Sequence, residues 1–474
     1  MKKILIRLVA ITAIALMAIS LVIGCKATTA GTITAAETTA AETTAAATTA
    51  AATTAAGTTA VNPDIAKYGL INGKEWIPPT VARGTTLRIL WQATPEADIL
   101  QEQAKEFTEK TGINIVWDIA TREDAPLKLV RELIEEAGSY DLAITGISEA
   151  ATYVGKGHYI PIEPYLTPEE LQLFYSKQWV TDPRTNKMAG IAQYNNWHML
   201  YYRSDLLNDP DEQAAFKTKY GRDLTVPTTN AELAQVCEFF NRPPNMYGYA
   251  IGGVDFSLRG EFTHYLYGQG KDVAFGDKDG NLALNTPEAI QAMKEMVEIT
   301  KYAPPGWETR TFFDNDTLML NGKTFAYTNW TYEWAQFQKD MPGKIDIVEP
   351  TQQGTVLSGY VALIPVKTQN LDAAVAFQKF IGAYHIQKDH FIKTGGNFPA
   401  RSDVFEDPDV KSAPGFEVLQ KPSAYAKPFN ITWYSEASTG IHDAFFDVVN
   451  GKKTVEEAMN WLVNVKFAGR KITE

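Results

Sequence analysis

The sequence predicts an α/β protein with more than one domain, built on a parallel sheet with helical crossovers. Two observations predict this fold class: strand and helix patterns alternate along the chain from residue 85 onward, and 474 residues are too many for one ordinary hydrophobic core. A third is the long extended run at residues 190–202, which is polar at its centre and suits a strand that crosses between two domains.

The predicted elements follow one another in a regular order. Residues 86–91 predict a strand, and residues 98–111 predict an amphipathic helix closed by Gly112. Thr286 and Pro287 are a typical helix start, with Thr as N-cap and Pro in the first turn. Further strands are predicted at residues 113–119, 140–145, 324–328 and 360–366. Further helices are predicted at residues 127–137, 148–155, 231–240, 286–301, 373–381 and 454–465, and residues 277–281 predict a hairpin turn between two short strands.

The N-terminus is typical of an export signal. A basic start at residues 1–7 precedes an uncharged apolar stretch at 8–24 and then Cys25. Residues 21–25, Leu-Val-Ile-Gly-Cys, resemble the lipobox of bacterial lipoproteins, in which the cysteine is acylated and becomes the mature N-terminus. The resemblance implies a signal peptide at 1–24 and a lipid anchor on Cys25 that holds the protein at the extracytoplasmic face of the cell membrane. The alternative is that the apolar stretch stays uncleaved as a membrane helix, although its length is at the lower limit for crossing a bilayer.

The next two segments differ from the rest of the chain in composition. Residues 25–60 consist almost entirely of Ala and Thr, without an aromatic residue, and predict a disordered tether rather than a helical stalk. Residues 61–84 contain three prolines and predict an irregular lead-in. The second cysteine, Cys237, lies on the apolar face of the predicted helix at 231–240, so we expect a buried thiol and no internal disulfide.

Composition and motifs exclude several classes of function. A net charge of −12 argues against a nucleic-acid binder, which needs a basic surface. The six histidines lack metal-ligand spacing, and the sequence contains neither a phosphate-binding Gly-rich loop nor a nucleophile elbow. We therefore expect no metal, no cofactor and no catalytic nucleophile.

Aromatic residues alternate with amides and carboxylates at the ends of several predicted strands. Examples are Trp91 with Gln92, and the runs at 194–197, 329–334 and 431–436. Such polar groups need partners if they are buried. They suit a site for a molecule with apolar faces and many hydroxyl groups, and a pyranose ring is such a molecule.

Several short motifs, in this order, resemble those of the extracellular solute-binding proteins of ABC transporters, in the sugar-binding family that includes maltose-binding protein. The resemblance covers nearly all of residues 85–470. Its motifs are Glu-Phe-Thr-Glu-Lys-Thr-Gly-Ile at 106–113, Tyr-Tyr-Arg-Ser-Asp-Leu-Leu at 201–207, Gly-Tyr-Val-Ala-Leu-Ile-Pro at 359–365 and Asn-Gly-Lys-Lys-Thr-Val-Glu-Glu-Ala at 450–458.

The resemblance implies a two-lobed periplasmic-binding-protein-like fold of type II, whose lobes are joined by crossover hinge segments. It implies a first lobe at residues 85–194 plus 361–415 and a second lobe at 195–360 plus 416–474. It also implies a monomeric protein that is not an enzyme. Such a protein binds a mono- or oligosaccharide between the lobes and closes by hinge bending. It then delivers the ligand to the permease subunits of an ABC importer.

By position, the resemblance implies a set of ligand contacts in which aromatic rings stack on the ligand and polar side chains recognise its hydroxyl groups. These are Trp91, Gln92, Glu96, Ser148, Glu149, Tyr194, Asn195, Trp197, Asp255, Phe256, Trp330, Trp334, Trp433 and Tyr434.

Two other functions stay open at this point. Related folds bind polyamines, amino-acid derivatives or polyol phosphates, although an anionic ligand would want clustered arginines and only the scattered Arg259 and Arg401 are available. A secreted glycoside hydrolase needs only a pair of carboxylates, and acidic residues are plentiful.

Overall fold

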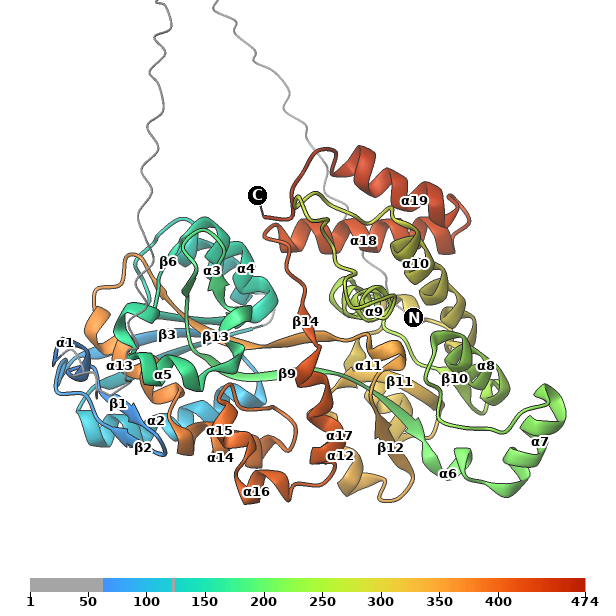
Figure 1. The fold of residues 1–474 in the computed structure, drawn as a ribbon, viewed down its shortest axis with the longest axis horizontal. Coiled ribbons are helices and arrows are strands. Elements are labelled where there is room, and N and C mark those ends of the chain that lie inside the picture. The colour runs from blue at the N-terminus through green and yellow to red at the C-terminus, as the bar shows by residue number, and fades with distance from the viewer. Residues whose placement is uncertain (1–62, 122–123, 474) are drawn as a thin grey trace, which may run out of the picture. The chain divides into compact units, whose positions relative to one another are not determined.

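The structure is a computed structural model that describes residues 63–121 and 124–473 (Figure 1). The predicted signal peptide at 1–24, the lipidation of Cys25 and the tether at 25–60 lie outside the described residues and stay predictions. Within the described ranges, no helix is both long enough and apolar enough to cross a bilayer.

One ten-stranded sheet runs through the described chain. Its strands are β3 (Thr86–Gln92), β4 (Asn114–Ala120), β5 (Leu142–Gly146), β6 (Tyr159–Ile160), β9 (Ala192–Arg203), β10 (Tyr247–Tyr249), β11 (Thr324–Trp330), β12 (Ile345–Val348), β13 (Val356–Pro365) and β14 (Lys427–Pro428). The order is β10-β11-β9-β13-β5-β3-β4, with β12 beside β9 and with β6 and β14 beside β13. Because β3 pairs in parallel with both β4 and β5, the predicted parallel sheet with helical crossovers is confirmed for these three strands.

The helices also follow the predicted order. They are α1 (Pro63–Ala66), α2 (Pro95–Thr111), α3 (Asp124–Leu133), α4 (Ile147–Lys156), α5 (Pro168–Leu173), α6 (Ser204–Leu207), α7 (Pro210–Tyr220), α8 (Asn230–Phe240), α9 (Asp255–Tyr267), α10 (Pro287–Ile299), α11 (Phe312–Leu320), α12 (Glu333–Asp340), α13 (Leu371–Ile381), α14 (Tyr384–Thr394), α15 (Ser402–Phe405), α16 (Pro408–Lys411), α17 (Phe416–Leu419), α18 (Tyr434–Val449) and α19 (Val455–Trp461). The predicted cap is confirmed, since Thr286 accepts a hydrogen bond from the Ala289 N–H and Pro287 opens α10.

Two long antiparallel strands, β9 and β13, connect the two parts of the sheet. Figure 1 shows β9 running from the elements around β3 to those around β11. Tyr360 of β13 pairs with Tyr194 of β9, and the register shifts at the next residue, which marks a bulge. Gly359 has φ +138°, and a Cβ there would stand 2.1 Å from the Tyr194 carbonyl oxygen, so this close approach of the two strands requires glycine.

The lead-in at 61–84 is not irregular throughout, which corrects the prediction. It contains an antiparallel hairpin of β1 (Leu70–Asn72) and β2 (Glu75–Ile77), and Gly73 supplies the positive φ, +57°, that its tight turn needs. Trp76 packs its ring 4.8 Å from that of Phe380. The three prolines obscured strands that are only three residues long and that depend on this distant contact.

The hairpin predicted at 277–281 is also only partly right. Asp277 Oδ1 accepts hydrogen bonds from the Asp279 and Asn281 N–H groups, which forms the turn. The chain on either side makes a single bridge between Gly276 and Leu282 instead of two strands.

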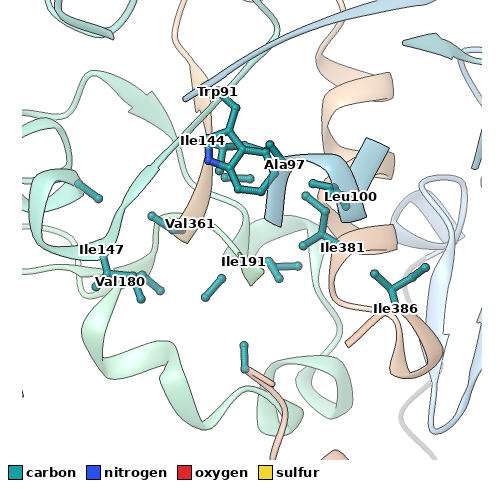
Figure 2. Packing of buried hydrophobic residues seen from close by; sticks show 14 of the residues in the cluster. Trp91, Ala97, Leu100, Ile144, Ile147, Val180, Ile191, Val361, Ile381 and Ile386 are labelled. Carbon is teal, nitrogen blue, oxygen red and sulfur yellow. The ribbon is translucent and has the colours of Figure 1, made fainter. Parts of the chain in front are cut away.

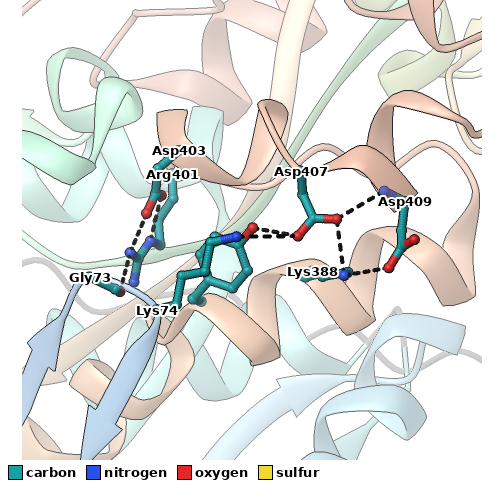
Figure 3. A network of polar contacts seen from close by, with 8 residues as sticks. Gly73, Lys74, Lys388, Arg401, Asp403, Asp407 and Asp409 are labelled. Atoms are coloured by element: carbon teal, nitrogen blue, oxygen red, sulfur yellow. Dashed lines mark hydrogen bonds and ion pairs between the residues drawn. The ribbon is translucent and has the colours of Figure 1, made fainter.

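A polar network ties the hairpin to the helices that follow β13 (Figure 3). The fully buried Arg401 donates to the Gly73 carbonyl at 2.8 Å and to Asp403 at 2.7 Å. Lys388 joins Asp407 at 2.9 Å and Asp409 at 2.6 Å. Arg401 is therefore committed to holding the fold, which removes one of the two arginines that an anionic ligand could have used.

The buried apolar residues form two clusters. The first lies around β3, β5, α2 and α13, and Figure 2 shows part of it, with Trp91 against Ile144 and Ala97. The second lies around α8, α9, α10 and α18 and includes Cys237, which is fully buried as predicted. The first cluster also takes in Tyr327 and Phe337, so the predicted lobe boundaries do not coincide with the two clusters and stay a prediction.

Candidate ligand site

Successive side chains of β9 point to opposite faces of the sheet, and this alternation organises the site. Tyr194, Asn196 and His198 share one face, which we call the Tyr194 face. Asn195 and Trp197 lie on the other, which we call the Trp197 face. The three hinge contacts predicted from sequence, Tyr194, Asn195 and Trp197, are therefore divided between two faces.

The Trp197 face is filled by packing. Trp197 is fully buried, its Nε1–H donates to the Leu419 carbonyl at 2.7 Å, and its ring stacks on Phe398 with centroids 4.7 Å apart. Asn195 donates to the Tyr175 hydroxyl at 3.3 Å and pairs through its backbone with Phe398, although its Oδ1 has no partner among the described residues. The structure therefore places Asn195 and Trp197 in the fold and not beside Tyr194.

The Tyr194 face carries buried polar atoms without partners. His198 is 5% exposed, and neither of its ring nitrogens has a hydrogen-bond partner in the described chain. Asn196 donates to Asn397 Oδ1 at 3.2 Å, but its own Oδ1 has no partner among the described residues. Burial, together with the nearby His264 and Arg259, lowers the pKa of His198 to about 3, so the imidazole is neutral.

Trp330 lies beside His198 at the end of β11. The two rings meet edge to face with centroids 4.2 Å apart, and the Trp330 ring is half-buried. Its backbone is held on both sides, since the Tyr201 hydroxyl donates to the Trp330 carbonyl at 2.8 Å and the Trp330 N–H donates to Asn329 Oδ1 at 2.8 Å. This indole is therefore fixed in place with part of its surface free.

A chain of aromatic rings continues from Trp330. Phe312 lies 6.5 Å from Trp330, and Phe256 meets Phe312 edge to face at 5.4 Å. Phe256 and its neighbour Asp255 open α9, and Asp255 accepts hydrogen bonds from Ser438 and Thr439 of α18. The structure therefore brings Trp330 and Phe256 together, whereas the Asp255 carboxylate is used to join two helices.

Buried carboxylates support β11 from both sides. Asp316 accepts from Asn329 Nδ2 at 2.5 Å, and desolvation together with the nearby Glu333 raises the pKa of Asp316. On the opposite side Glu261 accepts from Tyr249 and Thr328, and burial raises the pKa of Glu261 to about 7. Asn329 links Asp316 to the Trp330 backbone, so the Asp316 carboxyl positions the indole.

Of the ligand contacts predicted after β3, Glu96 is linked to the Tyr194 face by the side-chain amide of Asn397. Asn397 donates to Glu96 Oε1 at 2.8 Å and accepts from Asn196, so it joins α2 to β9. Trp91 is fully buried, with its ring 5.5 Å from Tyr360, and its Nε1–H has no partner in the described chain. Gln92, which follows Trp91, is half-buried at the end of β3.

The residues predicted on α4 meet the start of α18. The Tyr434 hydroxyl donates to Glu149 Oε1 at 2.8 Å, and the Arg259 guanidinium lies 4.2 Å from the centre of the Tyr434 ring. Ser148, one residue before Glu149, is buried. Glu149 and Tyr434 are thus brought together, as a shared site requires.

Two of the predicted tryptophans are instead used in packing. Trp433 donates its Nε1–H to the Lys471 carbonyl at 2.8 Å and packs on Phe467 with centroids 4.6 Å apart. Trp334 donates to the Pro414 carbonyl at 2.9 Å. Both rings lie in hydrophobic clusters with their polar edges satisfied.

The sequence prediction did not include Asn196 and His198, which the structure places on the Tyr194 face. The signal that could have found them was the strand period itself. Once Tyr194 is assigned to the site, the residues two and four positions later must share its face.

Comparison with known proteins places this geometry in a family. Residues 102–418 match the model described as bacterial extracellular solute-binding protein. Among curated protein sequences, none matches this chain.

Solved structures share the fold. Maltose-bound MalE3 of T. maritima is 21% identical, with 81% of this chain and 99% of that chain covered and a TM-score of 0.68. An ABC transporter solute-binding protein from Agrobacterium radiobacter K84, in complex with ribitol, is 20% identical over 80% of this chain and 97% of that one, with a TM-score of 0.67. One from Thermotoga lettingae TMO, bound with α-D-tagatose, is 20% identical over 81% and 98%, with a TM-score of 0.66. The predicted two-lobed α/β fold is therefore confirmed.

Proposed function

Because this chain belongs to the bacterial extracellular solute-binding protein family, we propose that it binds an uncharged sugar or polyol and delivers it to an ABC importer. The observation that carries this proposal is a set of unpartnered polar atoms on one face of β9, the two ring nitrogens of His198 beside the half-buried Trp330 and the Oδ1 of Asn196. A buried polar group without a partner costs about 1–3 kcal/mol, so these atoms favour a ligand that supplies hydrogen bonds.

The chemistry of these groups matches a polyhydroxyl ligand. A neutral imidazole offers one donor and one acceptor, and the free Oδ1 of Asn196 offers an acceptor. A hydroxyl group can donate and accept, so neighbouring hydroxyls of one sugar satisfy all three atoms. The apolar C–H face of the same molecule packs on the free surface of Trp330.

Charged solutes fit this site less well. The His198 ring is neutral, and the Glu96 carboxylate already accepts from Asn397. Arg401 is buried in its own network. The solved structures named above hold maltose, ribitol and α-D-tagatose, all uncharged polyhydroxyl compounds, which favours the same class of ligand.

Calorimetry and intrinsic tryptophan fluorescence test the proposal directly. The purified protein is titrated with maltose, tagatose, ribitol and mannitol, and in parallel with putrescine and glycerol 3-phosphate. We expect saturable binding of at least one uncharged compound and none of the charged ones. Binding of a charged solute alone would replace the sugar with a polyamine or polyol phosphate.

We infer that the protein transports and does not hydrolyse its ligand. The acidic side chains of the site are used in hydrogen bonds, as Asp255 is to α18 and Glu149 to Tyr434. An assay for reducing-sugar release from the oligosaccharides that bind should remain at background, and release proportional to protein concentration would identify a glycoside hydrolase.

The membrane anchor is a separate part of the proposal. We propose that residues 1–24 are removed and that Cys25 is acylated, which would hold a monomeric receptor at the extracytoplasmic face beside its permease. Metabolic labelling with a palmitate analogue should mark the wild-type chain and not Cys25→Ala. An unlabelled wild-type chain would show that the anchor prediction is wrong.

The lobes and their movement also remain proposals. We propose that residues 85–194 plus 361–415 and residues 195–360 plus 416–474 move as two bodies about β9 and β13 when the ligand binds. Fluorophores placed at the exposed Lys105 and Lys278 should report a change in separation when a binding sugar is added. An unchanged separation at saturation would contradict hinge closure.

A further inference from the structure

A cavity of about 720 Å³ lies where α4, the chain at 178–183 and the chain at 423–430 meet. Its volume is in the range of small-molecule sites, about 300–1,000 Å³. None of the predicted ligand contacts lines it, and neither do Asn196 and His198. The cavity is therefore a feature that the proposed sugar site does not account for.

The walls of this cavity are largely aromatic and apolar. Trp179, Tyr267, Tyr425 and Phe429 line it, and Val154 adds an aliphatic surface from α4. Two of these rings are held in place by their own hydroxyl groups. Tyr267 donates to the Pro428 carbonyl at 2.7 Å, and Tyr425 donates to Glu349 at 3.1 Å. Fixed aromatic walls of this kind suit a flat ring.

The charge of the lining is opposite to that of the protein. The chain carries 56 acidic residues and a net charge of −12, yet no Asp or Glu lines the cavity, whereas Lys271 and Lys427 both do. The Lys427 ammonium group donates to the Lys271 carbonyl and lies 5.4 Å from the centre of the Tyr267 ring. The nearest acidic influence on Lys427 is Asp272, which is exposed and outside the lining.

Lys427 is partly withdrawn from water. Desolvation lowers the pKa of its ammonium group in spite of Asp272. An anion bound beside it would offset that cost, because an opposite charge nearby favours the protonated amine. The lysine pair therefore favours an anionic group at this end of the cavity.

Backbone strain marks another part of the lining. Gln352 and Gln353 both line the cavity and both have left-handed backbone angles, with φ of +56° and +55°. Non-glycine residues in this region cost on the order of 1–3 kcal/mol each and concentrate at binding sites. The conformation is held in place, since Gln352 accepts from the Asn230 N–H at 3.0 Å and donates to the Gly268 carbonyl at 3.0 Å.

We propose that this cavity is a second ligand site, for a small aromatic carboxylate. Its ring would lie between the aromatic walls near Trp179 and Tyr425, and its carboxylate would meet Lys427 and Lys271. The side-chain amide of Gln353, another lining residue, would meet the polar edge of the same molecule, while that of Gln352 is used to hold the backbone. The lining shares no residue with the proposed sugar site, so each site can be tested with its own variants and probes.

The test uses three probes that share one ring and differ in charge. Indole-3-acetate is the anion, indole-3-ethanol the neutral compound and tryptamine the cation, each titrated into the full chain by calorimetry. We expect saturable binding of the anion, binding of the neutral compound at least threefold weaker, and none of the cation. Equal binding of all three, or no binding of the anion, would overturn the proposal.

Matched variants locate the binding. The double variant Lys271→Gln, Lys427→Gln should weaken the binding of indole-3-acetate at least tenfold. Ala151→Trp places a large side chain from α4 in the cavity and should abolish that binding. Lys278→Gln removes an exposed charge outside the lining and should change nothing. Thermal unfolding of each variant confirms folding, and anion binding that survives both the double variant and Ala151→Trp would place it elsewhere.

Discussion

The two faces of strand β9 use the same backbone for opposite purposes. On the Trp197 face, the polar edge of Trp197 is satisfied by Leu419 and its ring is stacked on Phe398. On the Tyr194 face, both ring nitrogens of the buried His198 and the Oδ1 of Asn196 have no partner in the described chain, and on the Trp197 face the Oδ1 of Asn195 also lacks one. A fold holds such atoms at a cost in stability, and His198 alone among these three side chains makes no hydrogen bond to the described chain, so we propose that the Tyr194 face is the one kept for the ligand.

The largest effect is expected on the Trp197 face. Trp197→Ala removes a fully buried ring and should lower the free energy of unfolding by about 3–5 kcal/mol, measured by chemical denaturation. Sugar affinity of the folded fraction should stay within twofold of wild type. Trp197→Phe keeps the stacking and is the matched control, with a smaller loss. A large loss of affinity in Trp197→Phe without loss of stability would break the distinction between the faces.

The next effect depends on pH and belongs to His198. This imidazole titrates at a pKa of about 3 in the folded protein and near 6.5 when unfolded, so the unfolded chain binds the extra proton as the pH falls below 6.5. Wild type should therefore lose stability relative to His198→Leu, by roughly 2 kcal/mol at pH 5. The buried His264 and His390 are present in both proteins and cancel in the difference.

Denaturation curves from pH 8 to pH 4 check this prediction. At pH 8 the two proteins should differ by no more than about 1–3 kcal/mol in favour of the leucine, because the unpartnered ring nitrogens are removed. A stability difference that is flat between pH 7 and pH 4 would show that His198 is solvated.

Ligand affinity should depend strongly on Trp330. Trp330→Ala removes the half-buried ring beside His198 and should weaken sugar binding at least tenfold, a loss of about 1.4 kcal/mol, in calorimetric titrations. Trp334→Phe is the control, because Trp334 is anchored to Pro414 in a cluster. If the control loses as much affinity as Trp330→Ala, the site has been placed on the wrong tryptophan.

The smallest effect is expected from two neighbouring asparagines. Asn196→Ala should weaken sugar binding about fivefold, since one hydrogen bond is worth about 1 kcal/mol. Asn195→Ala should leave the affinity within twofold, because Asn195 contacts Tyr175 on the other face. Equal effects of the two substitutions on affinity would remove the basis for assigning only one face to the ligand.

Local signals accounted for most of the fold. The long extended run at 190–202 placed β9 to within two residues at each end, and Thr286 with Pro287 marked the start of α10. The hairpin of β1 and β2 was missed because its strands are short and are stabilised by Trp76 against Phe380, which lies some three hundred residues later in the chain.

The site was harder to predict, because it depends on which distant groups contact each side chain. Trp330 and Trp433 look alike in the sequence, each surrounded by Thr and aromatic residues. What separates them is that Trp433 finds the Lys471 carbonyl and Phe467, while Trp330 meets a histidine with no partner. No local pattern around either residue records which distant group will reach its polar edge.

The sequence by itself determined the α/β class, the order of strands and helices and the burial of Cys237, because these depend on periodicity, caps and composition along the chain, and the family came from the resemblance of short motifs. Only the tertiary structure decided which aromatic and amide residues remain available to a ligand. Availability depends on whether the backbone or a side chain of another segment satisfies each buried donor and acceptor, and that is settled when the strands pair and the helices pack.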